Sequence, residues 1–276
     1  MPHDLSAETI EAAVHGGLGR PVRFFDAIGS TNDEAWGWAR RGAPEGALVV
    51  ADHQTRGRGR WDRDWIDRPG SSLMFSLILR PPPDLEAAGL LTTAAGLACA
   101  EAVEAVSGLK AGVKWPNDVT VDGKKMAGLL VESATRGDRV EVAVVGCGVN
   151  LHLPAGMPAE VADGATSISA ALESRDDSRA VDRVRLLAAF LAAFEHSYGG
   201  LTDSHGRAEV LRRAERRSVV LGLLVTARMA DGRTLSGIAR ALSPSGALEL
   251  EVDGARLALH SAEITQLRAA PSPRPR

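Results

Sequence analysis

The chain has 276 residues, 45% of them hydrophobic and 24% charged, with a formal net charge of −3. This length fits one large domain or a large and a small one, and the charge excludes a general attraction to nucleic acid or anionic membranes. The two cysteines, Cys99 and Cys147, fit a reducing cytosol better than a disulfide framework, and no histidine spacing indicates a zinc site. Because no stretch resembles a signal segment or a membrane span, we expect a cytoplasmic protein.

The first part of the chain alternates between predicted helices and strands. We expect strands over residues 22–27, 47–55 and 72–79, and helices within residues 1–20 and from the prolines at 81–83 to about residue 107. Thr31 followed by Glu34 has the spacing of a capping box, which predicts a further helix that ends at Gly42. In the third strand, large apolar side chains occupy alternate positions, which predicts one strongly apolar face.

Three apolar runs separated by tight turns follow, over residues 113–121, 125–133 and 139–151. The Asp122–Gly123 pair after the first run is a strong hairpin signal. We therefore predict an antiparallel meander that brings Lys114, Lys125 and Asn150 into one sheet region. Apolar side chains then recur at helical spacing over residues 181–198, which predicts a helix that packs in the core.

The character of the chain changes near Arg216. Residues 218–268 contain short apolar runs punctuated by turn-forming pairs such as Asp231–Gly232 and Asp253–Gly254, which predicts a small β-barrel. We expect one domain over residues 1–215, a second over residues 216–269, and a disordered proline-rich tail over residues 270–276.

Residues 54–65 form an arginine-rich loop in which Arg56, Arg58, Arg60 and Arg63 surround Gly57 and Gly59. Glycine lets the backbone approach a ligand closely, and the planar guanidinium matches phosphate and carboxylate. From these residues alone, a loop that folds over a small anion and an RNA-binding strip fit equally well. Three aspartates at positions 62, 64 and 67 interrupt the positive field and count against a long polyanion.

The remaining motifs favour the small anion. Residues 30–32 read Ser-Thr-Asn, residues 114–118 read Lys-Trp-Pro-Asn-Asp, residues 125–128 read Lys-Met-Ala-Gly, and residues 146–150 read Gly-Cys-Gly-Val-Asn. In this order and at these spacings, the chain resembles the biotin protein ligase family over about residues 22–268. The resemblance implies an α+β fold with a mixed, largely antiparallel sheet and flanking helices, related to class II aminoacyl-tRNA synthetases. It also implies that the second domain is a small SH3-like β-barrel.

The resemblance implies a two-step reaction in the first domain. ATP converts biotin to biotinyl-5′-AMP with loss of diphosphate, and a lysine of a carrier protein then takes the biotin and releases AMP. The implied partner is the biotin carboxyl carrier domain of acetyl-CoA carboxylase or a related carboxylase. Biotin and ATP are substrates, Mg²⁺ is implied by the use of ATP, and the sequence does not identify metal ligands.

The resemblance also assigns site residues. Those expected to bind biotin are Ser30, Thr31, Asn32, Gln54, Arg58, Gly59, Arg60, Trp65, Lys125 and Gly128. Those expected to bind the nucleotide are Arg58, Arg60, Arg63, Lys125, Gly146 and Asn150. Lys125, Arg58 and Arg60 are the expected catalytic residues, because fixed cations stabilise charge on the α-phosphate.

Some of these residues have a second possible role. The Lys-x-x-Gly spacing selects Lys125 over Lys124, which is expected to be a surface charge. Residues 30–32 also suit a helix N-cap, and both roles are compatible. Trp65 is either the apolar wall of the biotin site or a packing anchor. Asp118 is expected to orient a cation or to assist the acceptor lysine, whereas Trp115 and Pro116 are expected to be structural.

The arginine-rich loop departs from the family pattern at two adjacent positions. Trp61 fills a variable position, and Asp62 stands where the family commonly has a third glycine. The substitution places a carboxylate near a phosphate site. The sequence therefore does not establish how this loop closes over a ligand.

Two other functions compete with biotin ligation. A lipoate–protein ligase would share the fold and the chemistry. A DNA-binding repressor would need an N-terminal winged helix, and about 20 residues before the first strand are too few for one. We therefore expect a monofunctional ligase without DNA or membrane binding, and the oligomeric state, including a homodimer, stays open.

Overall fold

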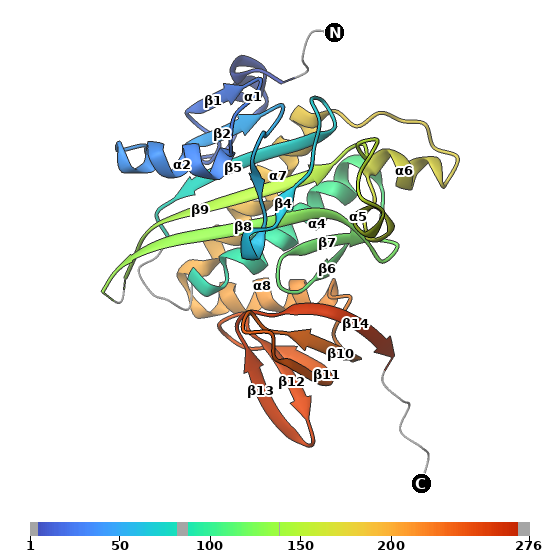
Figure 1. Cartoon of the computed structure of the whole chain (residues 1–276). Helices are drawn as coiled ribbons and strands as arrows, with labels where there is room; N and C mark the ends of the chain where they lie inside the picture. Colours follow the sequence, from blue (N-terminus) through green and yellow to red (C-terminus); the bar gives the residue numbers. More distant parts are fainter. Residues whose placement is uncertain (1–4, 82–87, 138, 270–276) are drawn as a thin grey trace.

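The computed structural model describes residues 5–81, 88–137 and 139–269, so the proline-rich tail predicted at 270–276 lies outside the described residues. A large sheet with helices on its faces makes up most of the molecule, and a smaller sheet lies beside it at the C-terminal end (Figure 1). None of the described helices is long and apolar enough to cross a membrane.

The large sheet has seven strands in the order β1-β2-β5-β9-β8-β7-β6. They are β1 (Val22–Phe25), β2 (Leu48–Ala51), β5 (Ser72–Leu79), β6 (Gly112–Lys114), β7 (Asp118–Val121), β8 (Lys124–Arg136) and β9 (Arg139–Asn150). Only β1 and β2 pair in parallel, so the predicted mixed and largely antiparallel sheet is confirmed. The predicted meander is β7, β8 and β9.

Helices cover both faces of this sheet. They are α1 (Ala7–Ala13), α2 (Thr31–Arg40), α4 (Leu91–Ser107), α5 (Ala159–Gly164), α6 (Ile168–Glu173), α7 (Arg183–Gly199) and α8 (Ser204–Arg216), with 3-10 turns η1 (Arg60–Asp62) and η2 (Gly200–Thr202). The main core lies where α4 and α7 pack on the sheet, with the rings of Phe75 and Phe190 4.8 Å apart. A smaller core joins α2 to the other face through Val49, Ile78 and Val144. The core helix predicted over residues 181–198 is therefore confirmed as α7.

Three local predictions need correction. All eight residues of β5 are buried, because helices cover both of its faces, so this strand does not have a single apolar face. The predicted run 113–121 is two strands, β6 and β7, since Pro116 has no N–H to continue a ladder. The N-cap of α2 is Ser30 without a side-chain capping bond, and Thr31 does not form the predicted capping box because its hydroxyl binds Gln54.

The smaller sheet is antiparallel in the order β13-β12-β11-β10-β14. Its strands are β10 (Leu223–Arg228), β11 (Thr234–Leu242), β12 (Leu248–Val252), β13 (Ala255–Leu259) and β14 (Glu263–Ala269), as the turn signals predict. Trp115 of the β6–β7 turn packs into the apolar cluster of this sheet, and its Nε1 donates to the Gly246 carbonyl at 3.0 Å. This contact fits the structural role expected of Trp115. The division into domains at residue 216 stays a prediction.

Candidate active site

A cavity of about 420 Å³ lies over the large sheet, and a small hairpin covers it. The hairpin consists of β3 (Gly57–Arg58) and β4 (Asp64–Trp65), joined by η1, and it carries the arginine-rich loop (Figure 1). Residues from α2, the hairpin, the β6–β7 turn, β8 and β9 form its wall. The predicted site residues found there are Ser30, Thr31, Asn32, Gln54, Arg58, Gly59, Arg60, Arg63, Trp65, Lys125, Gly128 and Gly146.

Glycines of β8 and β9 form the floor of the cavity. A Cβ atom at Gly148 would lie 2.7 Å from the indole of Trp65, and one at Gly146 would lie 2.1 Å from Asn32 Oδ1. At Gly128, a Cβ would come within 3.1 Å of both the Trp65 ring and Lys125 Nζ. The absence of side chains at these three positions therefore allows Trp65, Lys125 and Asn32 to lie against the sheet. Sequence reasoning missed Gly148, although the alternation of glycines at 146 and 148 places both on one face.

Polar groups converge at the α2 end of the cavity. The Gln54 side-chain oxygen accepts hydrogen bonds from the Thr31 backbone N–H at 2.6 Å and from the Thr31 hydroxyl at 3.0 Å. The Ser76 hydroxyl lies 2.6 Å from Asn32 Oδ1 and orients that amide. Ser30 lines the cavity, and its hydroxyl is not used for helix capping. Sequence reasoning missed Ser76, whose signal is a serine in the middle of an apolar strand.

Two buried N–H groups at the cavity have no acceptor within the described part of the chain. They are the indole Nε1 of Trp65 and the guanidinium Nε of Arg58. A buried donor without a partner costs about 1–3 kcal/mol, so such groups are rare unless a ligand uses them. Both groups favour a ligand that offers hydrogen-bond acceptors beside the hairpin.

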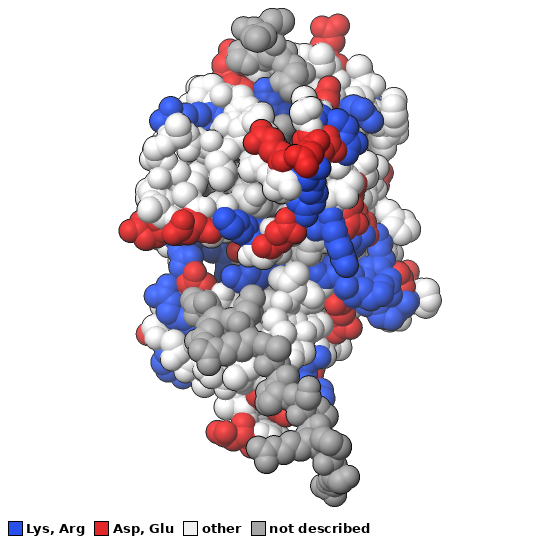
Figure 2. All heavy atoms as spheres, turned by 90° about the vertical axis from the view of Figure 1, so that its right-hand side faces the viewer, with Lys and Arg blue, Asp and Glu red and all other residues white. Residues whose placement is uncertain are grey.

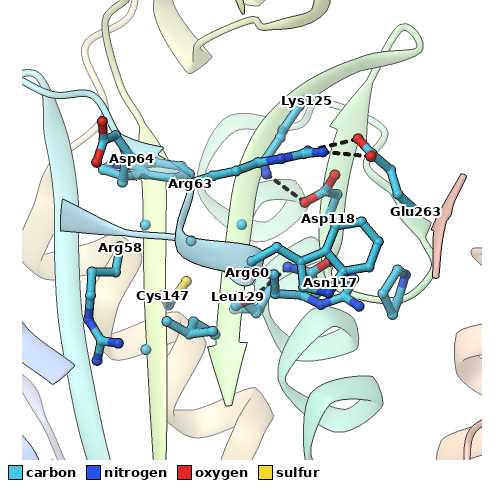
Figure 3. Close-up of a pocket in the computed structure, with 18 of the residues that line it drawn as sticks. Arg58, Arg60, Arg63, Asp64, Asn117, Asp118, Lys125, Leu129, Cys147 and Glu263 are labelled. Carbon is cyan, nitrogen blue, oxygen red and sulfur yellow. Dashed lines mark hydrogen bonds and ion pairs between the residues drawn. The ribbon is translucent and has the colours of Figure 1, made fainter. Parts of the chain in front are cut away.

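Carboxylates hold three of the four cationic side chains that line the cavity wall from the hairpin and β8. Figure 3 shows the pairs of Lys125 with Asp118 and of Arg63 with Glu263. Lys125 Nζ lies 2.7 Å from Asp118 Oδ1, which supports the expected role of Asp118 in orienting a cation. Arg58 reaches Asp33 at 2.8 Å and Glu132 at 3.1 Å. These ion pairs fix the cations in place before any ligand binds.

The third pair joins the hairpin to the smaller sheet. Both terminal nitrogens of Arg63 donate to Glu263 of β14, at 2.7 and 2.6 Å, and Arg228 adds a contact of 2.9 Å to the same carboxylate. The hydrogen bond from Arg63 is the main reason why the pKa of Glu263 falls to about 2. The arginine-rich loop is thus tied to the C-terminal sheet.

Arg60 is the exception among the four cations. Its guanidinium donates to Ser261 Oγ at 2.6 Å, to the Ala262 carbonyl at 3.3 Å and to Asn117 Oδ1 at 3.3 Å, all of them neutral acceptors. Burial is the main cause that lowers its pKa, while Asp118 and Glu263 oppose the shift at longer range. Within the described residues, Arg60 is a partly desolvated cation without a direct carboxylate partner.

The structure places other expected residues differently. Asn150 does not line the cavity, and its side-chain amide donates to the Thr166 carbonyl at 3.1 Å, so its nucleotide-binding role stays a prediction. Gly146 lies beside Asn32 at the α2 end. Trp61 has a positive φ of 57°, which is strained for a bulky residue, and the Arg60 guanidinium lies 5.2 Å from its ring. The side chain of Asp62 lies outside the described part of the chain.

Metal and nucleic-acid binding have little support from the described side chains. They contain no group of three or more His, Cys, Asp or Glu residues that could hold a metal ion. Lys and Arg side chains gather near the middle of the face in Figure 2, with Asp and Glu among them, so this face is not a uniform basic surface.

Comparison with known proteins agrees with this geometry. The sequence profile of the biotin/lipoate A/B protein ligase family matches residues 24–150. The biotin--[acetyl-CoA-carboxylase] ligase of Paracoccus denitrificans is 36% identical over 240 residues, which are 85% of this chain and 96% of that protein. The bifunctional ligase/repressor BirA of Bacillus subtilis (strain 168) is 35% identical over 248 residues, which are 90% of this chain and 74% of that protein.

A solved structure gives the same result for the fold. The biotin protein ligase from Aquifex aeolicus, in complex with biotin and ATP, superposes with a TM-score of 0.73 at 26% identity and covers 91% of this chain and 100% of its own. The expected α+β fold with a small C-terminal β-domain is therefore confirmed. The chain belongs to the biotin protein ligases of the biotin/lipoate A/B protein ligase family.

Proposed function

We propose that this protein activates biotin with ATP to biotinyl-5′-AMP and transfers the biotin to a lysine of the biotin carboxyl carrier domain of a carboxylase. The observation that carries the proposal is the make-up of one cavity. It combines a polar end at Thr31 and Gln54, an aromatic wall at Trp65 and a cationic end at Arg58 and Lys125. Biotin has a polar ureido group, an apolar ring and chain, and a carboxylate, in the same order.

The polar end suits the ureido group, which both donates and accepts hydrogen bonds. The Ser30 hydroxyl and the amides of Asn32 and Gln54 supply both kinds of group. Trp65 lies over Gly148 and offers an apolar surface to the fused rings and the chain. This arrangement orients the biotin carboxylate towards Lys125 and the arginines of the hairpin.

In the first step, a carboxylate oxygen of biotin attacks the α-phosphorus of ATP. The bond between that phosphorus and the bridging oxygen breaks, and its electron pair leaves with diphosphate. Lys125, Arg58 and Arg60 would stabilise the negative charge that spreads over the α-phosphate oxygens. Because Asp118 and Glu132 already orient Lys125 and Arg58, little reorganisation is needed during the reaction.

In the second step, the acceptor amine attacks the carbonyl carbon of biotinyl-5′-AMP. An amide bond forms, the bond from carbon to the phosphate oxygen breaks, and AMP leaves with that electron pair. The amine loses one proton in this step. The role of this chain is to retain the reactive anhydride until the acceptor arrives. The contact of Arg60 with Ser261, just before β14, and that of Arg63 with Glu263 of β14 keep the hairpin over the cavity.

We propose that the nucleotide-binding residues are those predicted from the sequence, and that the division into a catalytic and an SH3-like domain holds. The net charge of −3 and the mixed charges on the face in Figure 2 favour a function without a DNA target. We also propose a cytoplasmic location, which the two free cysteines, Cys99 and Cys147, fit. A footprinting experiment at physiological salt on promoters of biotin genes should show no protection.

Lipoate ligation is the alternative, and both relatives described above carry names of biotin ligases or of a ligase/repressor. The test is to incubate the protein with ATP, a carrier domain and either labelled biotin or labelled lipoate. We expect label on the carrier lysine only with biotin. Equal or greater labelling with lipoate would contradict the proposal.

A further inference from the structure

The segment that carries the arginine-rich loop has its two ends side by side. It leaves the large sheet after β2 and returns to it at the start of β5, and these two strands are antiparallel neighbours with Ala51 opposite Met74. Its first end, residues 52–54, therefore lies beside its last end, residues 67–70. An aspartate from each end bridges to the other.

Each of these two aspartates accepts a hydrogen bond from a backbone N–H of the opposite end. Asp52, in the first end, accepts from the Gly70 N–H at 3.2 Å. Asp67, in the last end, accepts from the Gln54 N–H at 3.3 Å through its Oδ2 atom. The His53 ring contacts the same oxygen, with its Nδ1 atom at 2.9 Å. These contacts hold the two ends of the segment together below the hairpin.

The Asp67 carboxylate is deeply buried. Its side chain is 1% exposed, and its other oxygen, Oδ1, has no donor among the described residues. Burial raises the pKa of Asp67, and the hydrogen bond with His53 opposes this rise. A buried carboxylate that is not fully paired lowers stability, so its presence beside a binding cavity favours a functional role for the contacts that it does make.

Gln54 connects Asp67 to the cavity. The Gln54 side-chain oxygen accepts from the N–H and the hydroxyl of Thr31, and its amide nitrogen lies 3.4 Å from Met74 Sδ. Gln54 lines the cavity, whereas Asp67 and His53 do not. The backbone N–H that Asp67 holds therefore belongs to the residue whose amide forms the polar end of the cavity.

We propose that Asp67 is a positioning residue for biotin, an inference that rests on the proposed function. Its carboxylate fixes the backbone of Gln54 and so the direction of the Gln54 amide. Because Thr31 already occupies the oxygen of that amide, the nitrogen is the group that remains to donate to the ureido oxygen of biotin. His53 supports this role by orienting Asp67 Oδ2 towards Gln54.

The test is biotin-dependent exchange of labelled diphosphate into ATP, with the concentration of biotin or of ATP varied. Asp67→Ala removes the acceptor of the Gln54 N–H. A hydrogen bond to a charged group is worth about tenfold or more in an equilibrium constant, so the KM for biotin should rise about tenfold. The kcat and the KM for ATP should each change less than about twofold, because Asp67 does not line the cavity.

Two further variants separate positioning from a general effect on folding. In Asp67→Asn, the amide oxygen can replace Oδ2 as the acceptor, so the KM for biotin should stay within about threefold of the wild type. His53→Phe keeps a planar ring in a side chain that is 26% exposed and removes the contact with Asp67, so the KM for biotin should rise about threefold. A variant that is only less stable would contain fewer active molecules, which lowers kcat at an unchanged KM.

Asp231 supplies the matched control. It accepts from the Arg233 N–H at 3.0 Å and from Arg233 Nε at 2.6 Å, in the turn between β10 and β11 and outside the lining of the cavity. Asp231→Ala therefore removes the same two kinds of contact as Asp67→Ala. It should match the wild type in the KM for biotin.

A KM for biotin within about twofold of the wild type in both Asp67→Ala and His53→Phe would overturn the assignment. Equal increases in the KM for biotin and the KM for ATP would also overturn it, because the variant would then disturb the whole cavity. If Asp67→Ala does not fold, His53→Phe decides by the same criteria. If the wild type shows no biotin-dependent exchange, the proposed function itself fails, and this outcome is distinct from a failure of the role of Asp67 alone.

Discussion

The environment of Lys125 differs from that of its neighbour Lys124 in a way that allows a direct comparison. Lys125 Nζ points into the cavity, 2.7 Å from Asp118 Oδ1 and 5.8 Å from the ring centre of Trp65. Lys124 is exposed and does not line the cavity. Two lysines adjacent in sequence therefore offer a catalytic variant and its matched control.

We predict that Lys125→Ala abolishes adenylation and that Lys124→Ala has little effect. Loss of a fixed cation beside the reacting phosphate should cost about 3 kcal/mol or more, which is about a hundredfold in rate. Diphosphate release with biotin and ATP measures this. Equal losses of rate in both variants would contradict a specific catalytic role for Lys125.

The floor of the cavity allows a test of packing. Gly148→Ala places a methyl group 2.7 Å from the Trp65 indole, so that the ring must move off the sheet. Overpacking of this kind costs about 1–3 kcal/mol, and biotin should bind about 10-fold or more weakly in a calorimetric titration. Gly199→Ala is the control, because nothing lies within 4 Å of a Cβ there. Equal affinities of Gly148→Ala and Gly199→Ala would contradict the role of Trp65 as a wall.

At the scale of elements, a buried ion pair joins β2 to α7. Arg183, the first residue of α7, donates to Asp52 Oδ1 at 2.6 Å, and the two side chains are 6% and 2% exposed. Asp52 also accepts from the Gly70 N–H at 3.2 Å. The pair lies between β2 and Gln54, so it fixes the strand end from which Gln54 enters the cavity.

We predict that Arg183→Ala lowers the free energy of unfolding by about 3 kcal/mol, because it removes the buried guanidinium that pairs with the Asp52 carboxylate. The exposed pair of Arg136 and Glu141, with side chains 83% and 46% exposed, supplies the control. Arg136→Ala should cost less than about 1 kcal/mol. Denaturation in urea measures the free energy of unfolding of both variants. Similar losses in the two would show that burial of the Arg183 pair does not increase its contribution to stability.

The contact between the hairpin and β14 has a defined pH dependence. The pKa of Glu263 is lowered from 4.5 to about 2, mainly by the hydrogen bond from Arg63. A lowered pKa means that the folded protein favours the carboxylate. The contribution of Glu263 to stability is therefore fully present above about pH 5 and is lost as the pH falls towards 2.

We accordingly expect Glu263→Gln to melt at a lower temperature than the wild type above about pH 5, and the two melting curves to converge as the pH approaches 2. Differential scanning calorimetry across this range measures the effect. Glu141→Gln, in an exposed pair, is the control and should show little difference at any pH. A difference for Glu263→Gln that does not change with pH would contradict the ion pair.

At the scale of the whole molecule, sequence reasoning succeeded where the local pattern was strong. The β7–β8–β9 meander and α7 follow from turn pairs and apolar spacing, and the motifs that meet in the cavity were expected to do so from the family resemblance. Helix α8 was not predicted, because only Val210 and Ala214 of its residues are both apolar and buried. Most of its residues are polar, so the sequence offers no long apolar pattern that would mark this helix.

The sequence also did not predict the contacts between residues that lie far apart along the chain. Nothing near Trp115 shows that it packs into the C-terminal cluster, since its hydrogen-bond partner Gly246 is 131 positions away. The link between Arg63 and Glu263 spans 200 positions. Such pairings depend on how the two sheets meet. The sequence predicted that the arginines of the loop belong to the site. It did not predict that Glu263 of β14 pairs with Arg63.

The central claim is that one molecule of this protein makes and retains biotinyl-5′-AMP. Native mass spectrometry after incubation with biotin and ATP tests it most directly. We predict a complex whose added mass equals that of biotinyl-5′-AMP, absent when biotin is replaced by lipoate and absent in Lys125→Ala. A wild-type protein that shows only ATP or no added mass, or that forms the adenylate of lipoate instead, would contradict the account.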